Sequence, residues 1–373
     1  MLVQYTEEAK VGAATSTPQI VRLADRQPAA DLVAEWRALA ASIESSSYFQ
    51  TPDWVLSWWE HSGRPPTEVA LWRDNHGCLE AVAFLSQTRE RLHRRIPFAV
   101  RLTTNAGSGR PYSADHCGWP VLPHRVPDVQ RWIATHPWGT SRLLRHLDPE
   151  TGVPCVPGGA HRVLTTVCPR LRIPDDPAKL SISSHFRQRM RRSQRELEHA
   201  GVAFTWRAPG TVTTEALDIL FTVSESRRSL KGSTSFVRAD VEDFHRRLIA
   251  RSGPGRGPAM VIAHRGERPV AAMYGFMWRD TFAIYQGGWD AAWASLSLGS
   301  VLVAESIRLA GLNGAKCFDF LRGTEAYKYR FGATDRLDET WLLPSGLGGV
   351  VTELKFAGVR MRRGELIRRA QPK

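Results

Sequence analysis

The sequence predicts an α/β protein made of two halves of similar size. The chain has 373 residues, which is enough for two ordinary domains. In each half, segments with the periodicity of helices alternate with short apolar runs typical of strands. Between the halves, residues 169–177 begin and end with proline, and we expect this segment to form the crossover.

The best-defined element of the N-terminal half is a helix that starts at residue 52. Thr51 can cap this helix, and Pro52 suits the first helical position. Trp54, Trp58 and Trp59 share one face, and we expect them to pack in the core rather than stack on a ligand. The other expected elements of this half are helices over residues 28–40 and 127–135, and strands over residues 20–23, 68–72, 79–88, 141–147 and 162–167.

A polar segment rich in glycine, serine and proline, residues 102–123, contains Tyr112, Ser113, Asp115 and His116. Loops of this composition within a compact domain are often functional. We expect Asp115 and His116 to face the groove between the halves and to bind the acceptor substrate. The alternative is a surface turn in which Asp115 bonds to its own backbone.

The C-terminal half is expected to begin with a helix over residues 184–200 that carries five arginines above a thin apolar stripe. The pattern fits either a solvated connecting helix or a contact with phosphate or another polyanion. The arginines are Arg187, Arg189, Arg191, Arg192 and Arg195. The elements expected next are strands over residues 202–206, 259–264, 270–278, 281–289, 317–321 and 339–343, helices over residues 214–229, 241–250 and 299–309, and a basic helix over residues 350–369.

Residues 281–332 form the stretch around which the rest of the chain is expected to be organised. A strand leads into a loop with one glycine and then into a helix, whose first N–H groups can hold a pyrophosphate. The residues at this turn are Leu298, Gly299, Ser300 and Val301. The turn is neither a Rossmann nor a P-loop motif. The alternative is that Ser297 acts only as an N-cap.

The charged and aromatic segment FDFLRGTEAYKYRFG, residues 318–332, supplies the candidate catalytic groups. We expect Glu325 or Asp319 to accept a proton, and Lys328 to orient a phosphate or a carbonyl. The backbone from Tyr285 to Gly288 is expected to stabilise an oxyanion. A structural ion-pair cluster around a tight turn explains the spacing equally well.

Composition limits the compartment and the partners. The formal net charge of +13 favours an anionic partner or, alternatively, a basic solvated surface. Five cysteines without CxxC spacing indicate a reducing compartment and neither disulfides nor a metal site. No signal peptide or transmembrane run is visible, so we expect a cytoplasmic protein whose first dozen residues are disordered.

The segments FDFLRGTEAYKYRFG and YQGGWDAAWASLSLGSVLVAESIRLA resemble GNAT-type acyltransferases of the CelD/BcsL group, which is linked to cellulose and exopolysaccharide synthesis. FQTPDWVLSWW and RMRRSQRELEHAG also resemble that group, and YKYRFG is more distantly similar to the lysine-bearing segment of Fem-type peptidyl transferases. The resemblance covers most of residues 37–332. The sequence departs from the GNAT pattern at SLSLGS. The usual pyrophosphate loop has more glycines and begins with an Arg or Gln.

The resemblance implies two tandem GNAT-like domains, each with a mixed, mostly antiparallel twisted sheet flanked by helices. The expected divisions are residues 17–170, a connecting segment 171–200, the acyltransferase domain 201–345 and a basic helix 346–373. It also implies transfer of an acyl group, such as acetyl, from acyl-CoA to an amine or hydroxyl of a cell-envelope or exopolysaccharide acceptor. Residues 298–301 would then fall at the pyrophosphate turn of CoA, and Lys328 would match the Fem-type lysine. Arg322 and Tyr327 fall in the same motif, and we expect Arg322 to bind CoA and Tyr327 to meet the acceptor, a small molecule, glycan or peptide.

Two other functions stay open at this point. A Fem-type enzyme would transfer an aminoacyl group from tRNA and use the arginine helix to bind it. A non-catalytic basic protein would bind nucleic acid or act as a scaffold. In each case the basic tail helix, with Lys355, Arg360, Arg362, Arg363, Arg368 and Arg369, is expected to allow peripheral contact with an anionic membrane.

Overall fold

The computed structural model describes residues 17–23, 28–91, 99–109, 114–176, 180–229 and 238–370. The predicted disordered N-terminus, Tyr112 and Ser113 lie outside the described residues. Of the predicted tail cations, the side chain of Lys355 is described, and those of residues 360–369 are not.

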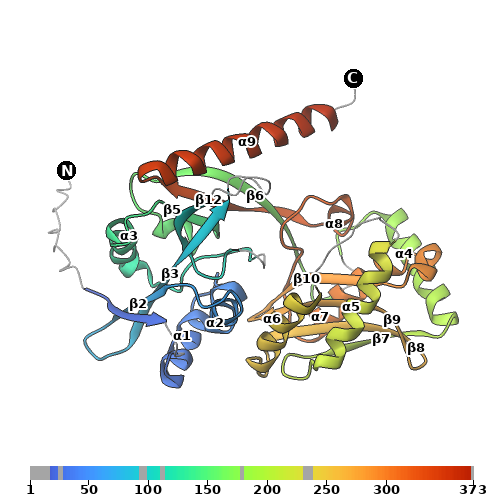
Figure 1. Cartoon of the computed structure of the whole chain (residues 1–373). Coiled ribbons are helices and arrows are strands. Elements are labelled where there is room, and N and C mark those ends of the chain that lie inside the picture. Colours follow the sequence, from blue (N-terminus) through green and yellow to red (C-terminus); the bar gives the residue numbers. More distant parts are fainter. Residues whose placement is uncertain are drawn as a thin grey trace, which may run out of the picture.

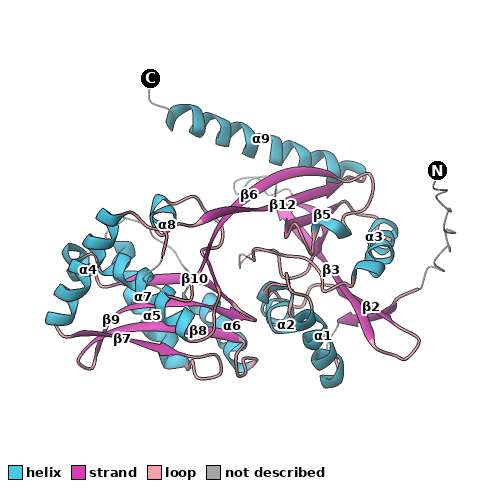
Figure 2. Cartoon of the chain, turned by 180° about the vertical axis from the view of Figure 1, so that it is seen from behind, coloured by secondary structure: helices cyan, strands magenta, loops and turns pink. Residues whose placement is uncertain are grey.

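The described strands form one twelve-stranded twisted sheet with the order β1-β2-β3-β4-β5-β12-β6-β11-β10-β9-β8-β7 (Figures 1 and 2). Neighbouring strands are antiparallel except for the pairs β4–β5 and β10–β11. The strands are β1 (Gln19–Leu23), β2 (Thr67–Arg73), β3 (Leu79–Arg91), β4 (Ala99–Asn105), β5 (Arg142–Leu147), β6 (His161–Arg172), β7 (Val202–Arg207), β8 (Gly257–Arg265), β9 (Arg268–Trp278), β10 (Thr281–Trp289), β11 (Cys317–Asp319) and β12 (Thr334–Leu343). This architecture confirms the predicted mixed, mostly antiparallel sheet flanked by helices.

The α-helices cover both faces of the sheet. One apolar cluster joins α1 and α2 to α5 and α6, and a second lies under α4 and α7. The helices are α1 (Ala30–Ser42), α2 (Pro52–His61), α3 (Val126–Thr135), α4 (Ser184–His199), α5 (Thr214–Ser229), α6 (Arg238–Ala250), α7 (Leu298–Leu312), α8 (Ala326–Arg330) and α9 (Gly346–Ala370). None of the helices within the described ranges combines the length and apolar character needed to span a bilayer.

Strands β6 and β12 join the two halves. β6 pairs with β11 of the C-terminal half, and β12 lies between β5 and β6. The crossover predicted at residues 169–177 was therefore wrong in its first part, because β6 continues through Pro169 to Arg172. The domain boundaries themselves stay a prediction, although β12 belongs to the predicted domain 201–345 and pairs only with strands of the first half.

Strand β4, which runs into the polar segment, was not predicted. The strand contains buried Thr103, Thr104 and Asn105, whose polarity resembles that of a loop. Hydrogen bonds satisfy two of these side chains: Thr103 bonds to Thr140, and the Asn105 amide donates to the carbonyl of Arg145. Polar composition therefore concealed a buried strand.

Candidate active site

A cavity of about 720 Å³ opens where β10 and β11 separate. The two parallel strands pair only from Thr281 to Ala283 and from Cys317 to Asp319. β10 then continues to Trp289, while the chain after β11 turns away. The start of α7 closes one side of the opening. The polar residues that line the cavity are Tyr285, Gln286, Ser297, Ser300, Arg322, Glu325, Tyr327 and Lys328.

A β-bulge shapes the β10 wall of this cavity. The register of β10 against β9 shifts between Ile284 and Gln286, which leaves Tyr285 as the additional residue. The Tyr285 ring lies 5.4 Å from the ring of buried His245 and 5.3 Å from that of Phe276, between centroids. The bulge therefore turns the strand at the cavity while aromatic contacts fix Tyr285.

The first turn of α7 faces the cavity through Leu298, Gly299 and Ser300. Ser297 precedes the helix in the left-handed conformation, with φ of 56°, and its side chain makes no capping hydrogen bond. Ser297 therefore occupies the N-cap position, but its side chain does not cap the helix. The N–H of Ser300 donates to the carbonyl of Ser297 at 2.9 Å. The N–H groups of Leu298 and Gly299, which precede it in the first turn, are therefore the ones that can bind an anion.

Gly299 has a packing role that the sequence did not indicate. A Cβ atom at this position would lie 3.0 Å from the ring of Trp289. The tryptophan therefore rests on the helix backbone, and a larger residue would displace it. Close approach of a ligand is not required to explain this glycine.

Lys328 holds the turn that follows β11. Its ammonium group donates hydrogen bonds to the carbonyls of Leu321, Arg322 and Gly323 at 3.2, 2.9 and 3.0 Å. It also lies 2.9 Å from a carboxylate oxygen of Glu325. The Lys328 side chain is 3% exposed and that of Glu325 is 59% exposed, so the carboxylate is the accessible partner.

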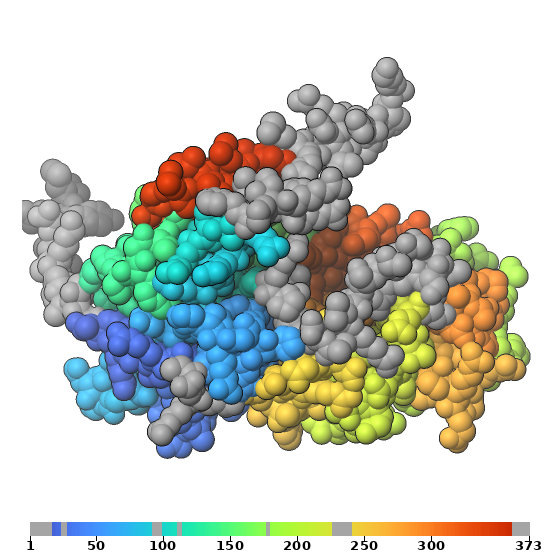
Figure 3. Space-filling view, viewed as in Figure 1, coloured from blue at the N-terminus to red at the C-terminus, as the bar shows by residue number. Residues whose placement is uncertain are grey.

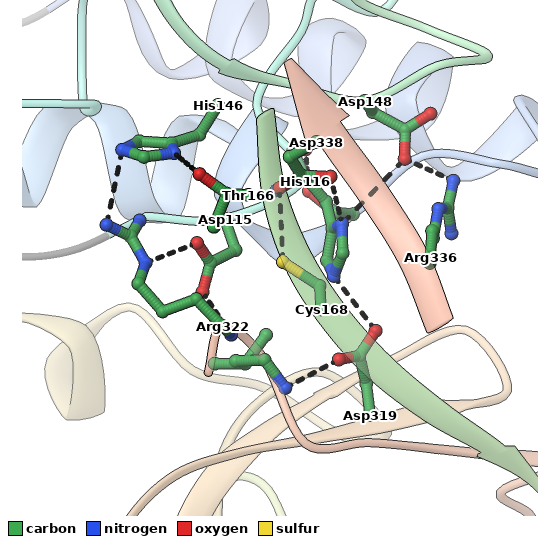
Figure 4. Close-up of polar contacts among 12 residues, drawn as sticks. Asp115, His116, His146, Asp148, Thr166, Cys168, Asp319, Arg322, Arg336 and Asp338 are labelled. Atoms are coloured by element: carbon green, nitrogen blue, oxygen red, sulfur yellow. Dashed lines mark hydrogen bonds and ion pairs between the residues drawn. The ribbon is translucent and has the colours of Figure 1, made fainter. Parts of the chain in front are cut away.

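Arg322 connects this turn to the N-terminal half (Figure 4). Its Nε donates to Asp115 at 2.5 Å, its backbone N–H donates to the same carboxylate at 3.0 Å, and its Nη1 lies 3.2 Å from Nε2 of His146. Burial raises the pKa of Asp115 above its usual range, against the opposing effect of the Arg322 charge. Asp115 is 2% exposed and pairs with Arg322 of the C-terminal half, so the alternative of a surface turn is wrong.

His116 lies at the centre of a buried charge cluster (Figure 4). Its Nδ1 lies 2.8 Å from Asp338, and its Nε2 lies 3.0 Å from Asp319. Arg336 pairs with Asp148, a further carboxylate of this cluster. Burial alone would lower the pKa of His116, but Asp338 and Asp319 raise it well above its usual value. Conversely, burial would raise the pKa of Asp319, but charged His116 brings it below its usual range.

The structure places the predicted site residues in three different surroundings. Residues at the 720 Å³ cavity are Tyr285, Leu298, Gly299, Ser300, Arg322, Glu325, Tyr327 and Lys328. Val301 is 1% exposed within the core, and Asp115, His116 and Asp319 belong to the buried polar cluster instead. His116 and Asp319 line a separate cavity of about 450 Å³ between the halves.

Several residues at the 720 Å³ cavity and around His116 were not predicted. Gln286 and Trp289 line the first cavity, and their position in YQGGW beside the predicted oxyanion backbone was an available signal. Asp338 and Asp148 hold His116 but lie far from it in sequence, so no local pattern pointed to them. Their contacts depend on strand pairing.

One group of metal-type ligands occurs among the described residues. Ligand atoms of His116, Cys168 and Asp338 lie within 4.8 Å of one another. The Asp338 carboxylate contacts both of the others, at 2.8 Å from Nδ1 of His116 and 3.7 Å from the Cys168 sulfur. Hydrogen bonds within the cluster therefore account for this arrangement.

Comparisons with known proteins agree with the fold. Residues 184–329 match the acetyltransferase (GNAT) domain model, whereas no curated protein matches the chain. Similar solved structures include FemX, at 10% identity and a TM-score of 0.61 over 86% of this chain and 98% of that one. Another is the C-terminal domain (DUF2156) of a putative lysylphosphatidylglycerol synthetase from Agrobacterium fabrum, at 11% identity and a TM-score of 0.56 over 88% and 96% of the two chains.

At 10–11% identity, these structures establish the fold alone. The family model covers the segment that contains α4, the β10–β11 opening and most of α8. Residues 184–329 of this chain therefore resemble the acetyltransferase (GNAT) domain model, within a fold that the chain shares with FemX.

Proposed function

We propose that the protein is an acyl-CoA-dependent acyltransferase whose donor occupies the 720 Å³ cavity. The observation that carries this proposal is the opening between β10 and β11, which meets the start of α7. N–H groups of Leu298 and Gly299 would hold the pyrophosphate. The thioester carbonyl would then lie along Tyr285 to Gly288, where backbone N–H groups would stabilise the developing oxyanion.

Direct transfer accounts for the remaining polar groups. The acceptor amine or hydroxyl attacks the thioester carbonyl, the carbon–sulfur bond breaks, and the CoA thiolate leaves. Glu325 accepts the proton from the acceptor, because its carboxylate is the exposed acid at the cavity. Tyr327, 37% exposed, would contact the acceptor. Asp319 is bound to His116 and lies outside the donor cavity, so a positioning role suits it better.

The acceptor is the least constrained part of the proposal. The resemblance of FDFLRGTEAYKYRFG to the CelD/BcsL group supports a cell-envelope or exopolysaccharide precursor in the cytoplasm. Asp115 would position Arg322, to which it is hydrogen-bonded. His116 would face the acceptor, because it lines the 450 Å³ cavity between the halves. We also propose the division into domains that the resemblance implies, at residues 17–170, 171–200, 201–345 and 346–373.

Calorimetry with CoA and acetyl-CoA tests donor binding. A Ser300→Asp variant places a negative charge beside the expected phosphates, although acids near a helix N-terminus stabilise the helix. We expect it to weaken CoA binding by at least about 10-fold at unchanged melting temperature. Ser295→Asp is the matched control, since Ser295 is exposed and lies outside the cavity lining. Absence of CoA binding, or equal binding by both variants, would contradict the donor site.

A second candidate is aminoacyl transfer from tRNA, favoured by the similarity to FemX and by α4. The side chains of Arg189, Arg191, Arg192 and Arg195 are exposed on this helix, while its apolar stripe packs in the second core cluster. Bulk tRNA in the same binding assay separates the candidates: tRNA binding without CoA binding would favour the second. Binding of tRNA with no turnover of any aminoacyl group would instead indicate the non-catalytic alternative.

A further inference from the structure

The helix α9 presents an apolar face to solvent. Leu347, Val350 and Leu354 are 82%, 55% and 63% exposed. Their spacing of three and four residues places them on one face of the helix. Figure 3 shows this part of α9, in red, at the outer edge of the molecule. Val350 and Leu354 also border a shallow groove, together with Ala357 of α9 and Val163 of β6. The ion pair between His161 and Glu353 lines the same groove.

The opposite face of α9 is already used. Thr352 and Phe356 are 1% and 6% exposed, and Phe356 packs with Leu102 and Leu342 of the sheet. Lys355 pairs with Glu90 of β3. The helix is therefore fixed to the body of the protein, and its exposed apolar face is not needed to hold it there.

Size and charge decide what fits this face. A stable dimer buries about 800 Å² on each partner, far more than three side chains provide. The net charge of +13 also opposes association with a second copy. An anionic lipid surface fits both the small apolar area and the positive charge. A few apolar side chains can enter the membrane interface while basic groups meet the headgroups.

The composition of α9 agrees with this choice. After Lys355, the sequence of the helix contains Arg360, Arg362, Arg363, Arg368 and Arg369 and one acid, Glu365. Each basic residue near an anionic bilayer adds to the attraction, which salt screens. We propose that α9 docks the protein reversibly on an anionic membrane surface through Leu347, Val350 and Leu354.

Vesicle flotation with the full chain tests this proposal. We expect binding to phosphatidylglycerol-rich vesicles, little binding to pure phosphatidylcholine, and loss of binding at high salt. The triple variant Leu347→Gln, Val350→Gln, Leu354→Gln should weaken partitioning by at least about 10-fold. Leu312→Gln is the control, because Leu312 is 67% exposed at the end of α7, outside this face.

Two results would overturn the proposal. The first is equal vesicle binding by the triple variant and the wild type, or no binding to anionic vesicles at low salt. The second is a wild-type dimer, measured by light scattering, that the triple variant converts to a monomer, since the face would then bind a second copy. Circular dichroism and CoA binding of the triple variant should match the wild type, which separates this test from the proposed acyl transfer.

Discussion

Lys328 is the residue whose expected and observed surroundings differ most. Its ammonium group satisfies three carbonyls of one tight turn, in which Leu321 adopts φ of 52° and Gly323 adopts φ of 114°. A backbone with successive carbonyls directed at one point needs a cation to hold it. We therefore favour a positioning role for Lys328, which fixes Arg322 and Glu325 at the cavity.

Replacement of Lys328 by Met should destabilise the protein by about 3 kcal/mol, because buried carbonyls lose their donor. Urea unfolding measures this loss. Lys316→Met, at an exposed position, should change stability by less than about 0.5 kcal/mol. If Lys328→Met unfolds at the wild-type urea concentration but transfers no acyl group, Lys328 acts in the chemistry and the positioning role is wrong.

The proton acceptor is tested by Glu325→Gln. We expect turnover to fall by about 100-fold, a typical contribution of a general base, while CoA affinity changes less than about twofold. Glu267→Gln, in the exposed β8–β9 turn, serves as the control. Unchanged turnover in Glu325→Gln would remove this residue from the mechanism.

Two elements, β10 and α7, create the cavity together. The bulge at Tyr285 turns β10, Trp289 at its end rests on Gly299, and α7 begins at that contact. Gly288 lets α5 approach, since a Cβ there would lie 2.6 Å from the backbone of Ser224. The glycines of this segment thus serve contacts between elements.

Gly299→Ala should destabilise the protein by about 1–3 kcal/mol through overpacking against Trp289. Adding Trp289→Leu should recover most of that loss, which a double-mutant cycle measures by thermal unfolding. CoA affinity should recover in the same double variant. If stability recovers and CoA affinity does not, then CoA itself contacts Gly299 or the indole of Trp289. That result would contradict a role in packing alone.

Two features join the halves of the molecule: the buried charge cluster around His116, and strand β12, which lies between β5 and β6. His116, from the first half, contacts Asp319 and Asp338 from the far end of the chain. Asp338 belongs to β12, which inserts between β5 and β6. Relative motion of the halves would have to break these buried contacts, so the groove between them is held rigidly at this point.

This cluster makes stability depend on pH. The folded pKa of His116 is raised, so its contribution is complete below about pH 6.5 and is lost as pH rises through the folded value. Between about pH 6.5 and the folded pKa of His116, the unfolding free energy of the wild type should fall toward that of His116→Gln. The difference between them should shrink by about 1.4 kcal/mol per pH unit. Urea unfolding at several pH values measures it. A difference that stays constant would show that His116 is neutral in the folded protein.

Local patterns were sufficient for much of the fold. The Thr51 cap, Pro52 and the tryptophan face placed α2, because each acts within a few residues. The cavity was also largely predictable, since residues 284–303 and 320–328 are near in sequence and supply most of its lining. The start of α7 was predicted from the glycine at position 299, and the turn after β11 from the charged residues that follow Asp319.

Tertiary structure alone decided the long-range contacts. His116 and Asp338 are separated by 222 residues, and no periodicity specifies which strand lies beside which. The same limit explains why the contact of Gly299 with Trp289 was not predicted, and why polar β4 was taken for a loop. A sequence encodes helix and strand through neighbours a few residues apart, whereas the partner of a buried charge is fixed only when the sheet assembles.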